Sequence, residues 1–279
     1  MEGSSMARWR YAVSAFLLCC GFASVASAQN IEDGLVLYLP MNEGAGKKVK
    51  DFSPMGFDTE MSGDAPKWVA SDNPKFATAL EFDGASNFVM IDMEGQGADI
   101  NAHADPDAGL SICAWVKVLE TATDAHGQSR QPIVMKGSGA GWEFALYVYD
   151  GFAPGMSVWD CGGSGVSEPS GGQLNQDEWH YQCGVFNAED GVEVFLDGDD
   201  APVAAAGVGG GTVCDGPRPV FIAHREDGQW LNAQIAEVRM WNRVISDADI
   251  DVSMNTVGGL AVRPAGKLTT MWGALRQGS

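Results

Sequence analysis

Asp-Gly pairs punctuate this 279-residue chain, and they constrain its fold more than any other sequence feature. Between Leu35 and Trp241 they occur at positions 83–84, 150–151, 190–191, 197–198, 215–216 and 227–228. Glycine accepts a positive φ and aspartate hydrogen-bonds its own backbone, so the dipeptide favours tight turns between antiparallel strands. The runs between these turns are short and rich in β-branched and aromatic residues, which is typical of strands. The pattern therefore predicts an all-β chain.

Eleven segments between Leu35 and Trp241 have the length and the apolar character of strands. They are Leu35–Pro40, Ala79–Phe82, Phe88–Asp92, Ser111–Val118, Ile133–Lys136, Glu143–Tyr149, Met156–Asp160, Trp179–Phe186, Val192–Asp197, Val220–Ala223 and Gln234–Trp241. More than ten short strands at this spacing indicate a sandwich or a barrel. The clearest hairpin is predicted around the turn at Asp190-Gly191.

Alternation within one of these segments assigns its residues to opposite faces of a sheet. Phe144, Leu146 and Val148 alternate with polar and aromatic residues, which predicts one face in the core and one that carries carboxylates and rings. A single helix start is predicted at Ser246, since this hydroxyl can cap the backbone and the acidic residues that follow suit a helix N-terminus. We expect this helix to cover an edge of the sandwich for about two turns.

Residues 1–28 have the pattern of a secretory signal peptide. Arg8 and Arg10 form a basic region, an apolar stretch runs from Ala12 to Val25, and Ala26-Ser27-Ala28 fits a cleavage site. The alternative is a membrane anchor, but the apolar stretch is too short and too interrupted by Gly and Ser to span about 30 Å of hydrocarbon. We expect a secreted or extracellular protein with no membrane insertion after cleavage. In a cell with an outer membrane it would be periplasmic.

The charge of the chain disfavours two classes of partner. There are 37 Asp and Glu against 17 Lys and Arg, a net charge of −20, and cleavage would remove Glu2, Arg8 and Arg10 to leave −21. Nucleic acids and anionic lipids both attract basic surfaces, so neither is an expected partner. Two interpretations of the acidic balance stay open, namely solubility and cation binding.

Four cysteines follow the signal segment: Cys113, Cys161, Cys183 and Cys214. An even number in an oxidising compartment predicts two disulfides, and four cysteines allow three pairings. Cys161 and Cys214 both lie in turn-like sequence and are favoured as one pair. Cys113 and Cys183 lie in apolar strand sequence, so buried free thiols are the alternative for them. Zinc is not expected, because no CxxC spacing occurs.

The chain lacks the residue patterns of common hydrolases. A retaining glycosidase needs two carboxyl groups about 5–5.5 Å apart, which on one strand means neighbouring positions of the same face. No Glu-x-Asp-x-Glu triple occurs, and Glu193 and Asp197 would lie about 13 Å apart along their strand. No HExxH, Gly-x-Ser-x-Gly or phosphate-loop pattern is present. We expect a protein that is not an enzyme, with His180 as a hydrogen-bonding residue of its strand.

Seven stretches form an ordered set along the chain. They are Gly34–Gly44, Val49–Ser53, Ala79–Gly84, Leu110–Lys117, Asp177–Tyr181, Val194–Gly198 and Ile235–Ser246. Their order and content resemble the laminin-G-like jelly-roll domains of the concanavalin A-like lectin/glucanase superfamily. The resemblance covers about residues 33–252 and implies two antiparallel sheets in a jelly roll. We expect a signal peptide at 1–28, this domain at 29–252 and a basic tail at 253–279.

The resemblance also implies a structural Ca²⁺ where the first turn region meets the closing strand. Carried over to this chain, it implicates Asp51, Asp58 and Glu237, and Asp83 is a further candidate from its Asp-Gly turn. Calcium takes six to eight oxygen ligands, so a set of carboxylates suits it. The family commonly has an acidic pair before Val-Arg, whereas this chain has Ala236 before Glu237, so one ligand is missing. The alternative is that these aspartates only form turns.

Glycan binding is the expected activity, because aromatic rings stack on sugars while polar groups read their hydroxyls. The candidates on the predicted polar face and its loops are Trp142, Tyr147, Tyr149, Trp159, Asp160, His224, Arg225 and Trp230. Trp115, Trp179 and Trp241 are expected in the core. For each of the candidates, the alternative is that the side chain packs in the core or at its rim and contacts no ligand.

The function expected from the sequence is thus a secreted, non-catalytic module that binds an acidic or neutral polysaccharide or glycan, with a structural calcium. The alternative is an extracellular domain for protein–protein adhesion. A glycoside hydrolase is less favoured than either, and the fold alone does not choose among them.

Overall fold

The computed structural model describes residues 30–62, 64–92, 109–121, 129–138, 141–210, 213–214, 216 and 218–258. The predicted signal peptide and the part of the predicted tail after residue 258 lie outside these ranges. The elements are β1 (Leu35–Leu39), β2 (Thr59–Ser62), β3 (Lys67–Ala70), β4 (Thr78–Asp83), β5 (Phe88–Ile91), β6 (Gly109–Glu120), β7 (Arg130–Ser138), β8 (Gly141–Tyr149), β9 (Pro154–Trp159), β10 (Gly165–Ser167), β11 (Trp179–Asn187), β12 (Gly191–Leu196), β13 (Ala204–Ala206), β14 (Val220–Ile222), β15 (His224–Arg225), β16 (Gln229–Trp230), β17 (Asn232–Trp241) and α1 (Asp247–Asn255).

All eleven predicted segments contain a strand, so the expectation from turn spacing and apolar runs is confirmed. Six short strands were not predicted: β2, β3, β10, β13, β15 and β16. Each has only two to four residues, which is too few for a period of two to stand out in the sequence.

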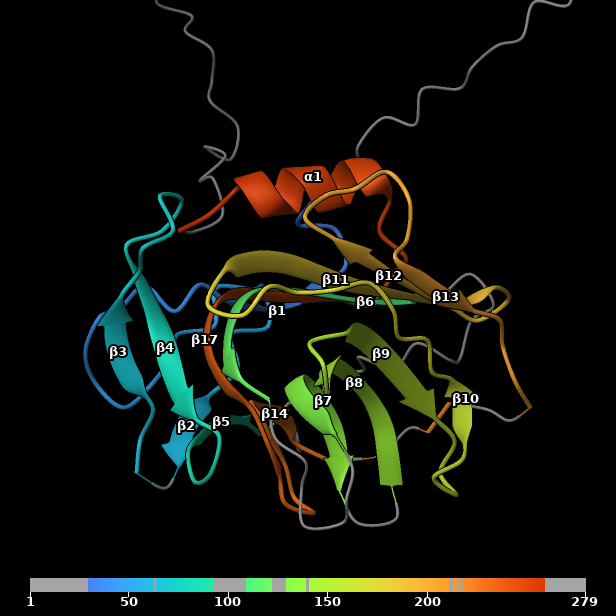
Figure 1. Cartoon of the computed structure of the whole chain (residues 1–279), viewed down its shortest axis with the longest axis horizontal. Coiled ribbons are helices and arrows are strands. Elements are labelled where there is room, and N and C mark those ends of the chain that lie inside the picture. Colours follow the sequence, from blue (N-terminus) through green and yellow to red (C-terminus); the bar gives the residue numbers. More distant parts are fainter. Residues whose placement is uncertain are drawn as a thin grey trace, which may run out of the picture.

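The strands form two antiparallel sheets that face each other (Figure 1). Sheet A has the order β13-β12-β11-β6-β17-β4-β3, with β1 paired to β17, and sheet B has the order β10-β9-β8-β7-β14-β5-β2. A separate two-stranded hairpin, β15-β16, lies against β7. The predicted fold, a two-sheet antiparallel jelly-roll sandwich, is confirmed.

The main core lies between the two sheets. Phe144, Leu146 and Val148 of β8 enter it as their alternation predicts, and they belong to one cluster with Val116 of β6 and Ile235 of β17. Each of these side chains is at least 97% buried. Burying a side chain of this size contributes about 1.5–3 kcal/mol, so alternation along the strands supplies the driving force for the sandwich.

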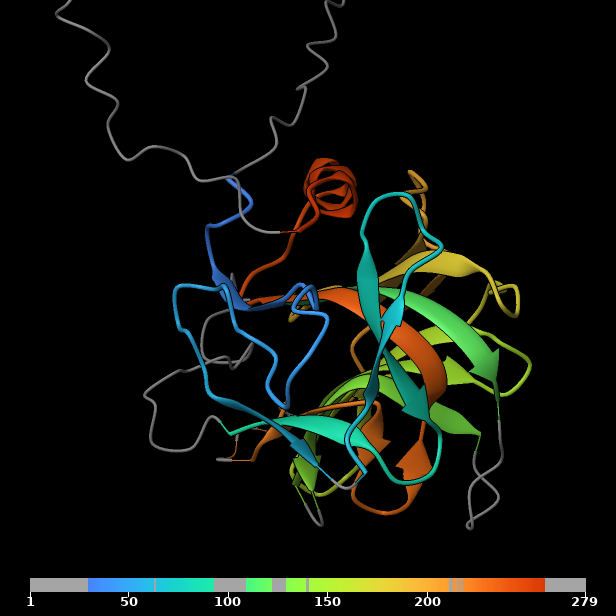
Figure 2. The same ribbon diagram turned by 90° about the vertical axis from the view of Figure 1, so that its left-hand side faces the viewer.

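The helix α1 covers the outer face of sheet A (Figures 1 and 2). Its start is as predicted: the Ser246 hydroxyl accepts from the Asp249 amide and the Asp249 carboxylate accepts from the Ser246 amide, a reciprocal capping box. Ile250 packs with Tyr181 and Trp241 in a second apolar cluster. The helix ends at Asn255, so regular structure continues past the expected domain end at residue 252.

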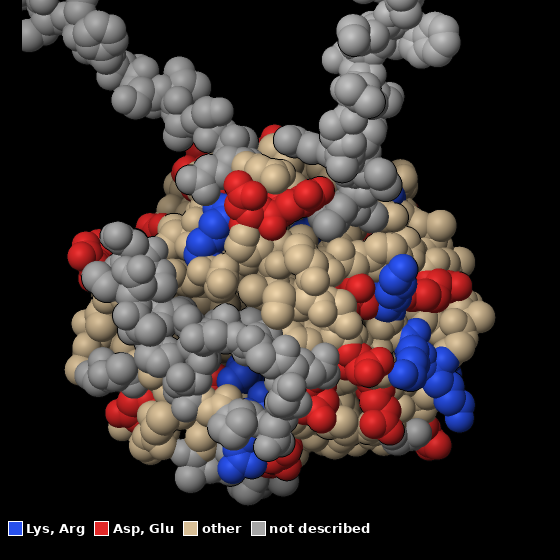
Figure 3. Space-filling model, turned by 180° about the vertical axis from the view of Figure 1, so that it is seen from behind, with Lys and Arg blue, Asp and Glu red and all other residues tan. Residues whose placement is uncertain are grey.

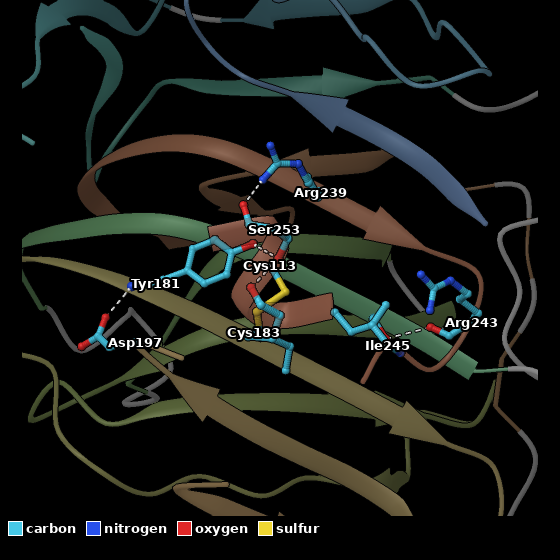
Figure 4. Close-up of a disulfide and its surroundings, with 10 residues drawn as sticks. Cys113, Tyr181, Cys183, Asp197, Arg239, Arg243, Ile245 and Ser253 are labelled. Atoms are coloured by element: carbon cyan, nitrogen blue, oxygen red, sulfur yellow. Dashed lines mark hydrogen bonds between the residues drawn. A yellow bond between two sulfur atoms is a disulfide. The ribbon is translucent and has the colours of Figure 1, made fainter. Parts of the chain in front are cut away.

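Both disulfides are formed. The predicted pair Cys161–Cys214 is confirmed, whereas the alternative of free thiols at Cys113 and Cys183 is wrong. These two cysteines stand directly opposite each other on β6 and β11, with their Cα atoms 4.1 Å apart, under α1 (Figure 4). Apolar surroundings predict burial in either redox form, so only the strand register shows that they are partners.

The charge is dispersed over the face of the molecule seen from behind in Figure 3. On the back face Asp and Glu lie in several small groups, some of them beside Lys or Arg, rather than in one continuous patch (Figure 3). Within the described part of the chain, no helix has the length and apolar character needed to cross a membrane.

Candidate functional site

The outer face of sheet B carries an aromatic cluster. Tyr147 and Tyr149 alternate with core residues along β8 and so point away from the core, and Trp159 at the end of β9 joins them. The ring centroid of Tyr147 lies 5.9 Å from that of Tyr149 and 6.1 Å from that of Trp159, in edge-on arrangements. Trp142 packs against the same cluster. Four aromatic candidates from the two strands β8 and β9 are therefore neighbours.

Arg225 fills the centre of this aromatic cluster. Its guanidinium carbon lies 4.2 Å from the ring centroid of Trp142 and 5.9 Å from that of Trp159. One terminal nitrogen donates to the Tyr147 hydroxyl at 2.9 Å, and the other donates to Asp227 at 2.7 Å. Cation–π contacts of this kind are favourable by about 0.5–2 kcal/mol, depending on desolvation. The predicted ligand-binding arginine is thus held by the rings themselves.

The Tyr147 hydroxyl is a neutral acceptor in this arrangement. Burial raises the pKa of Tyr147 well above its usual value, and the nearby Arg225 guanidinium offsets only part of that effect. Tyr147 is 0% exposed and Arg225 is 7% exposed, so both are support for the surface rather than contact points on it.

A second aromatic group adjoins the first through the β15-β16 hairpin. The His224 ring stacks on Trp230 at a centroid distance of 3.9 Å and on Phe88 of β5 at 4.6 Å. Burial lowers the pKa of His224 to about 4, so its imidazole is neutral near pH 7. A neutral ring stacked on Trp230 fixes the orientation of that indole.

The seven residues predicted to bind a glycan therefore fall into two groups. Tyr147, Trp159, His224 and Arg225 are buried, whereas Trp142, Tyr149 and Trp230 are half-buried and present part of their rings to solvent. Asp160 is taken up by a turn, because its Oδ1 accepts from the amides of residues 162 and 164. Of the tryptophans expected in the core, Trp115 and Trp241 are buried and Trp179 is half-buried.

Asp51, a predicted calcium ligand, has both carboxylate oxygens occupied by protein donors. Oδ1 accepts from the amides of Tyr38 at 2.9 Å and Ser53 at 2.8 Å. Oδ2 accepts from the Ser53 hydroxyl and the Phe57 amide, each at 2.8 Å. Four donors on one buried carboxylate hold the loop after β1 in place, which is a structural role that requires no metal.

Glu237, the predicted ligand in the closing strand, is likewise engaged. Its Oε2 accepts from the Tyr38 hydroxyl at 2.7 Å and pairs with Arg239 at 2.9 Å, and its Oε1 accepts from the Gly258 amide at 2.7 Å. The side chain is 0% exposed, and burial raises the pKa of Glu237, although Arg239 counteracts this. The cationic partner of this carboxylate is an arginine.

The two remaining predicted calcium ligands, Asp58 and Asp83, also have protein partners. Asp83 caps its own turn, with amides of Ala85 and Ser86 each 2.9 Å from Oδ1, and Asp58 is an exposed partner of Lys48 at 3.5 Å. Among the described residues no group of three or more His, Cys, Asp or Glu is arranged to hold a metal. These four carboxylates do not fit a shared calcium site, and calcium binding stays a prediction.

His180 carries a carboxylate partner but is held on both sides. Its Nδ1 lies 2.7 Å from Asp197 Oδ2, and its Nε2 accepts from the Asn175 amide at 3.0 Å. The proton therefore sits on Nδ1, and Nε2 is not free to act as a base. This geometry fits the hydrogen-bonding role expected for His180.

Sequence reasoning missed three residues that build the aromatic face: Phe88, Asp227 and Gln229. Gln229 accepts from Arg225 at 3.3 Å across the hairpin, and Asp227 in the turn accepts from Arg225 at 2.7 Å. The signal was available in the Asp227-Gly228 turn, because alternate residues around a hairpin share a face. Phe88 was placed in a strand, but its stacking on His224 depends on long-range packing that periodicity does not reveal.

Comparison with known families gives one match. The model described as Laminin_G_3, concanavalin A-like lectin/glucanases superfamily, matches residues 92–251, which is more than half of the chain. A comparison with curated proteins finds no match.

Solved structures with a similar fold include the binding domains of a mosquitocidal protein and of botulinum neurotoxins. The binding domain of Paraclostridial mosquitocidal protein 1 gives a TM-score of 0.61 at 11% identity, over 80% of this chain and 52% of that one. The binding domain of botulinum neurotoxin DC in complex with SialylT gives 0.59 at 13% identity, over 81% and 52%. The same domain in complex with rat synaptotagmin II gives 0.60 at 12%, over 81% and 52%. This chain spans about half the length of these structures, and the likeness concerns the fold.

Proposed function

Because this chain belongs to the Laminin_G_3 family of the concanavalin A-like lectin/glucanases superfamily, we propose that it is a secreted, non-catalytic module that binds glycans. The single observation that carries the proposal is the aromatic face of sheet B. There Trp142, Tyr149 and Trp230 present partly exposed rings on a rigid base of buried rings and Arg225.

This arrangement suits sugar recognition for a physical reason. A glycan gains most from rings whose orientation is fixed before binding, because ordering flexible side chains costs affinity. Trp142 is fixed by the guanidinium of Arg225, and Trp230 is fixed by His224. The aromatic faces are apolar, while the surrounding carboxylates and amides can read hydroxyl groups.

Two further observations support the proposal. Two disulfides fit an oxidising compartment, which agrees with the secretory segment predicted at residues 1–28. The binding domain of botulinum neurotoxin DC, which has a similar fold, is described in complex with SialylT and also in complex with rat synaptotagmin II. The second description favours protein adhesion as the alternative function.

A glycan array followed by affinity chromatography on immobilised polysaccharides tests the proposal. We expect retention of the wild-type chain and weaker retention of Trp142→Ala and Tyr149→Phe. Trp68→Ala is the matched control, since Trp68 is a half-buried tryptophan of β3 in sheet A, away from the aromatic face. A chain that is retained on no glycan but captures a defined extracellular protein would replace glycan binding with adhesion.

A further inference from the structure

A small pocket opens beside Trp230, at the end of sheet A where three strands meet. Its described lining consists of Asp83, Gly84, Glu120, Trp230 and Asn232, and its volume is about 120 Å³. Pockets that enclose drug-sized ligands have about 300–1,000 Å³, so this one suits a single ring that stays partly exposed.

The strand register places three of these polar side chains in one row. Asn232 at the start of β17 pairs with Asp83 of β4 on one side and with Glu120 of β6 on the other. Glycine is required at position 84, next to this row, because a Cβ there would approach the Asn232 Cβ to 2.8 Å and because its φ is +69°. The backbone turn therefore brings an amide between two carboxylates.

Asp83 is a permanent hydrogen-bond acceptor in this row. Burial pushes its pKa upward, but hydrogen bonds from Ser86, Ala85 and Asn87 outweigh that effect and leave the pKa below its usual value. Its Oδ1 serves the turn, whereas Oδ2 accepts from the Ser86 hydroxyl at 2.7 Å and keeps a further lone pair. That lone pair and the exposed Glu120 carboxylate can each accept from a hydroxyl.

Trp230 supplies the apolar wall. Its indole is stacked on His224 at 3.9 Å and also lines the pocket, so its orientation is set without a ligand. A stacking ring beside two carboxylates and an amide is the combination that binds the C–H face of a sugar and its hydroxyl groups at once.

The charge of the row decides which sugars fit. A carboxylate or sulfate on the ligand would meet both Asp83 and Glu120, and a like charge about 4 Å away in water weakens binding about five-fold for each carboxylate. A neutral ring meets no such repulsion and donates its hydroxyls instead. We infer that the pocket formed by Asp83, Glu120, Trp230 and Asn232 is a subsite for one neutral hexose ring, and that it selects against uronic, sialic and sulfated sugars. This inference rests on the proposed glycan binding and names the sugar class for one part of it.

Ligand-observed NMR and calorimetry with pairs of methyl glycosides test the inference. Each pair consists of a methyl hexopyranoside and the corresponding methyl hexuronide, which differ only by the carboxylate at C6. We expect the wild-type chain to bind at least one neutral hexoside, and to bind its hexuronide about 25-fold more weakly or not at all at low salt.

Variants locate the effect in the pocket. Glu120→Gln should weaken binding of the neutral hexoside about ten-fold, because a charged acceptor is lost. It should also reduce the difference in affinity between the hexoside and its hexuronide. Asn232→Ala should also weaken binding. Glu193→Gln is the matched control, since it removes one exposed carboxylate from β12 of the same sheet and should leave binding unchanged.

Four results would overturn the inference, and the last of them also separates it from the proposed function. Hexuronides that bind as tightly as neutral hexosides would refute the selectivity, and unchanged binding in Glu120→Gln and Asn232→Ala would refute the location. If calcium ions bind with these residues as ligands and sugars do not bind, the pocket is a cation site. If the chain is retained on polysaccharide columns but binds no methyl hexoside, only the proposed subsite is refuted. If the chain is retained on no polysaccharide column, glycan binding itself is refuted.

Discussion

Arg239 and Glu237 form an ion pair 2.9 Å long with both side chains buried, although only one residue separates them on β17. The strand accommodates this through an irregularity in its pairing with β6, where Glu237 adopts a φ of +57°. Arg239 also lies 4.1 Å from the ring centroid of Tyr38 and donates to the Ser253 carbonyl at 2.7 Å (Figure 4). One buried arginine therefore connects β1, β17 and the end of α1.

Replacing Arg239 with Met should destabilise the protein by about 3–5 kcal/mol, because Glu237 would be left buried without its cation. Urea unfolding measures the loss, and Glu237→Gln/Arg239→Met is the control, which should regain part of it. Burial already raises the pKa of Glu237 above its usual 4.5, and loss of Arg239 raises it further. A raised pKa in the folded state gives stability that is present at low pH and lost as the pH rises, so the deficit of Arg239→Met should shrink toward pH 4.5. A deficit that is independent of pH would contradict this account.

Arg225→Ala should destabilise the protein by about 2–4 kcal/mol, since the buried Tyr147 hydroxyl and Asp227 lose their donor and Trp142 loses its cation. Arg225→Lys keeps the charge but not the planar fork, so an intermediate loss is expected. Arg218→Ala, at an exposed arginine, is the control. Thermal unfolding and glycan retention are to be measured together. If Arg225→Ala is retained on the glycan column as strongly as the wild type, glycan binding does not depend on the support that Arg225 gives to the rings.

His224 should make stability depend on pH. Its pKa in the folded state is about 4, against 6.5 ordinarily, because burial disfavours the charged ring. Between these values the unfolded chain binds a proton that the folded chain does not, so stability falls as the pH drops from 6.5 to 4. The contribution is at most about 3 kcal/mol. His224→Phe keeps a stacking ring and should lack this part of the pH dependence. If the stability of the wild type and that of His224→Phe fall equally between pH 6.5 and pH 4, His224 is not the source of this pH dependence.

Reduction should cost stability through both disulfides, which close loops with sequence separations of 70 and 53 residues. Removing one such cross-link typically costs about 2–5 kcal/mol, so Cys113→Ala/Cys183→Ala should melt well below the wild type. Non-reducing peptide mapping should yield only the Cys113–Cys183 and Cys161–Cys214 links. A peptide that joins Cys113 to Cys161 would show a different pairing.

We expect no calcium to bind at Asp51, Asp58, Asp83 and Glu237. Neither calcium nor a chelator should therefore change the melting midpoint through these residues. Asp51 and Glu237 are saturated by protein donors, and a ligand stabilises only by binding the folded state. Melting with calcium chloride and with EGTA measures this. A rise with calcium that Asp51→Asn abolishes would support the calcium site expected from the sequence.

The local pattern of the sequence was enough to predict the strands, the fold class and the helix start. Turns at Asp-Gly pairs and the capping box at Ser246 depend on hydrogen bonds within a few residues, and alternation along β8 depends on the geometry of a single strand. The family resemblance rested on the same strand-and-turn segments. Strands of two residues, such as β15 and β16, escape because they carry no period.

Only the tertiary structure decided what the individual side chains do. Cys113 and Cys183 are partners because β6 and β11 pair in one register, and Arg225 supports the aromatic rings because its hairpin folds back over β7. Tyr38 of β1 donates to both Asp51 and Glu237, and Glu237 lies 199 residues away from it in the sequence. Each of these outcomes depends on contacts between strands that the chain brings together only on folding. The sequence by itself therefore determined the architecture and the candidate residues, and the packing of the two sheets separated supporting residues from those that a ligand can reach.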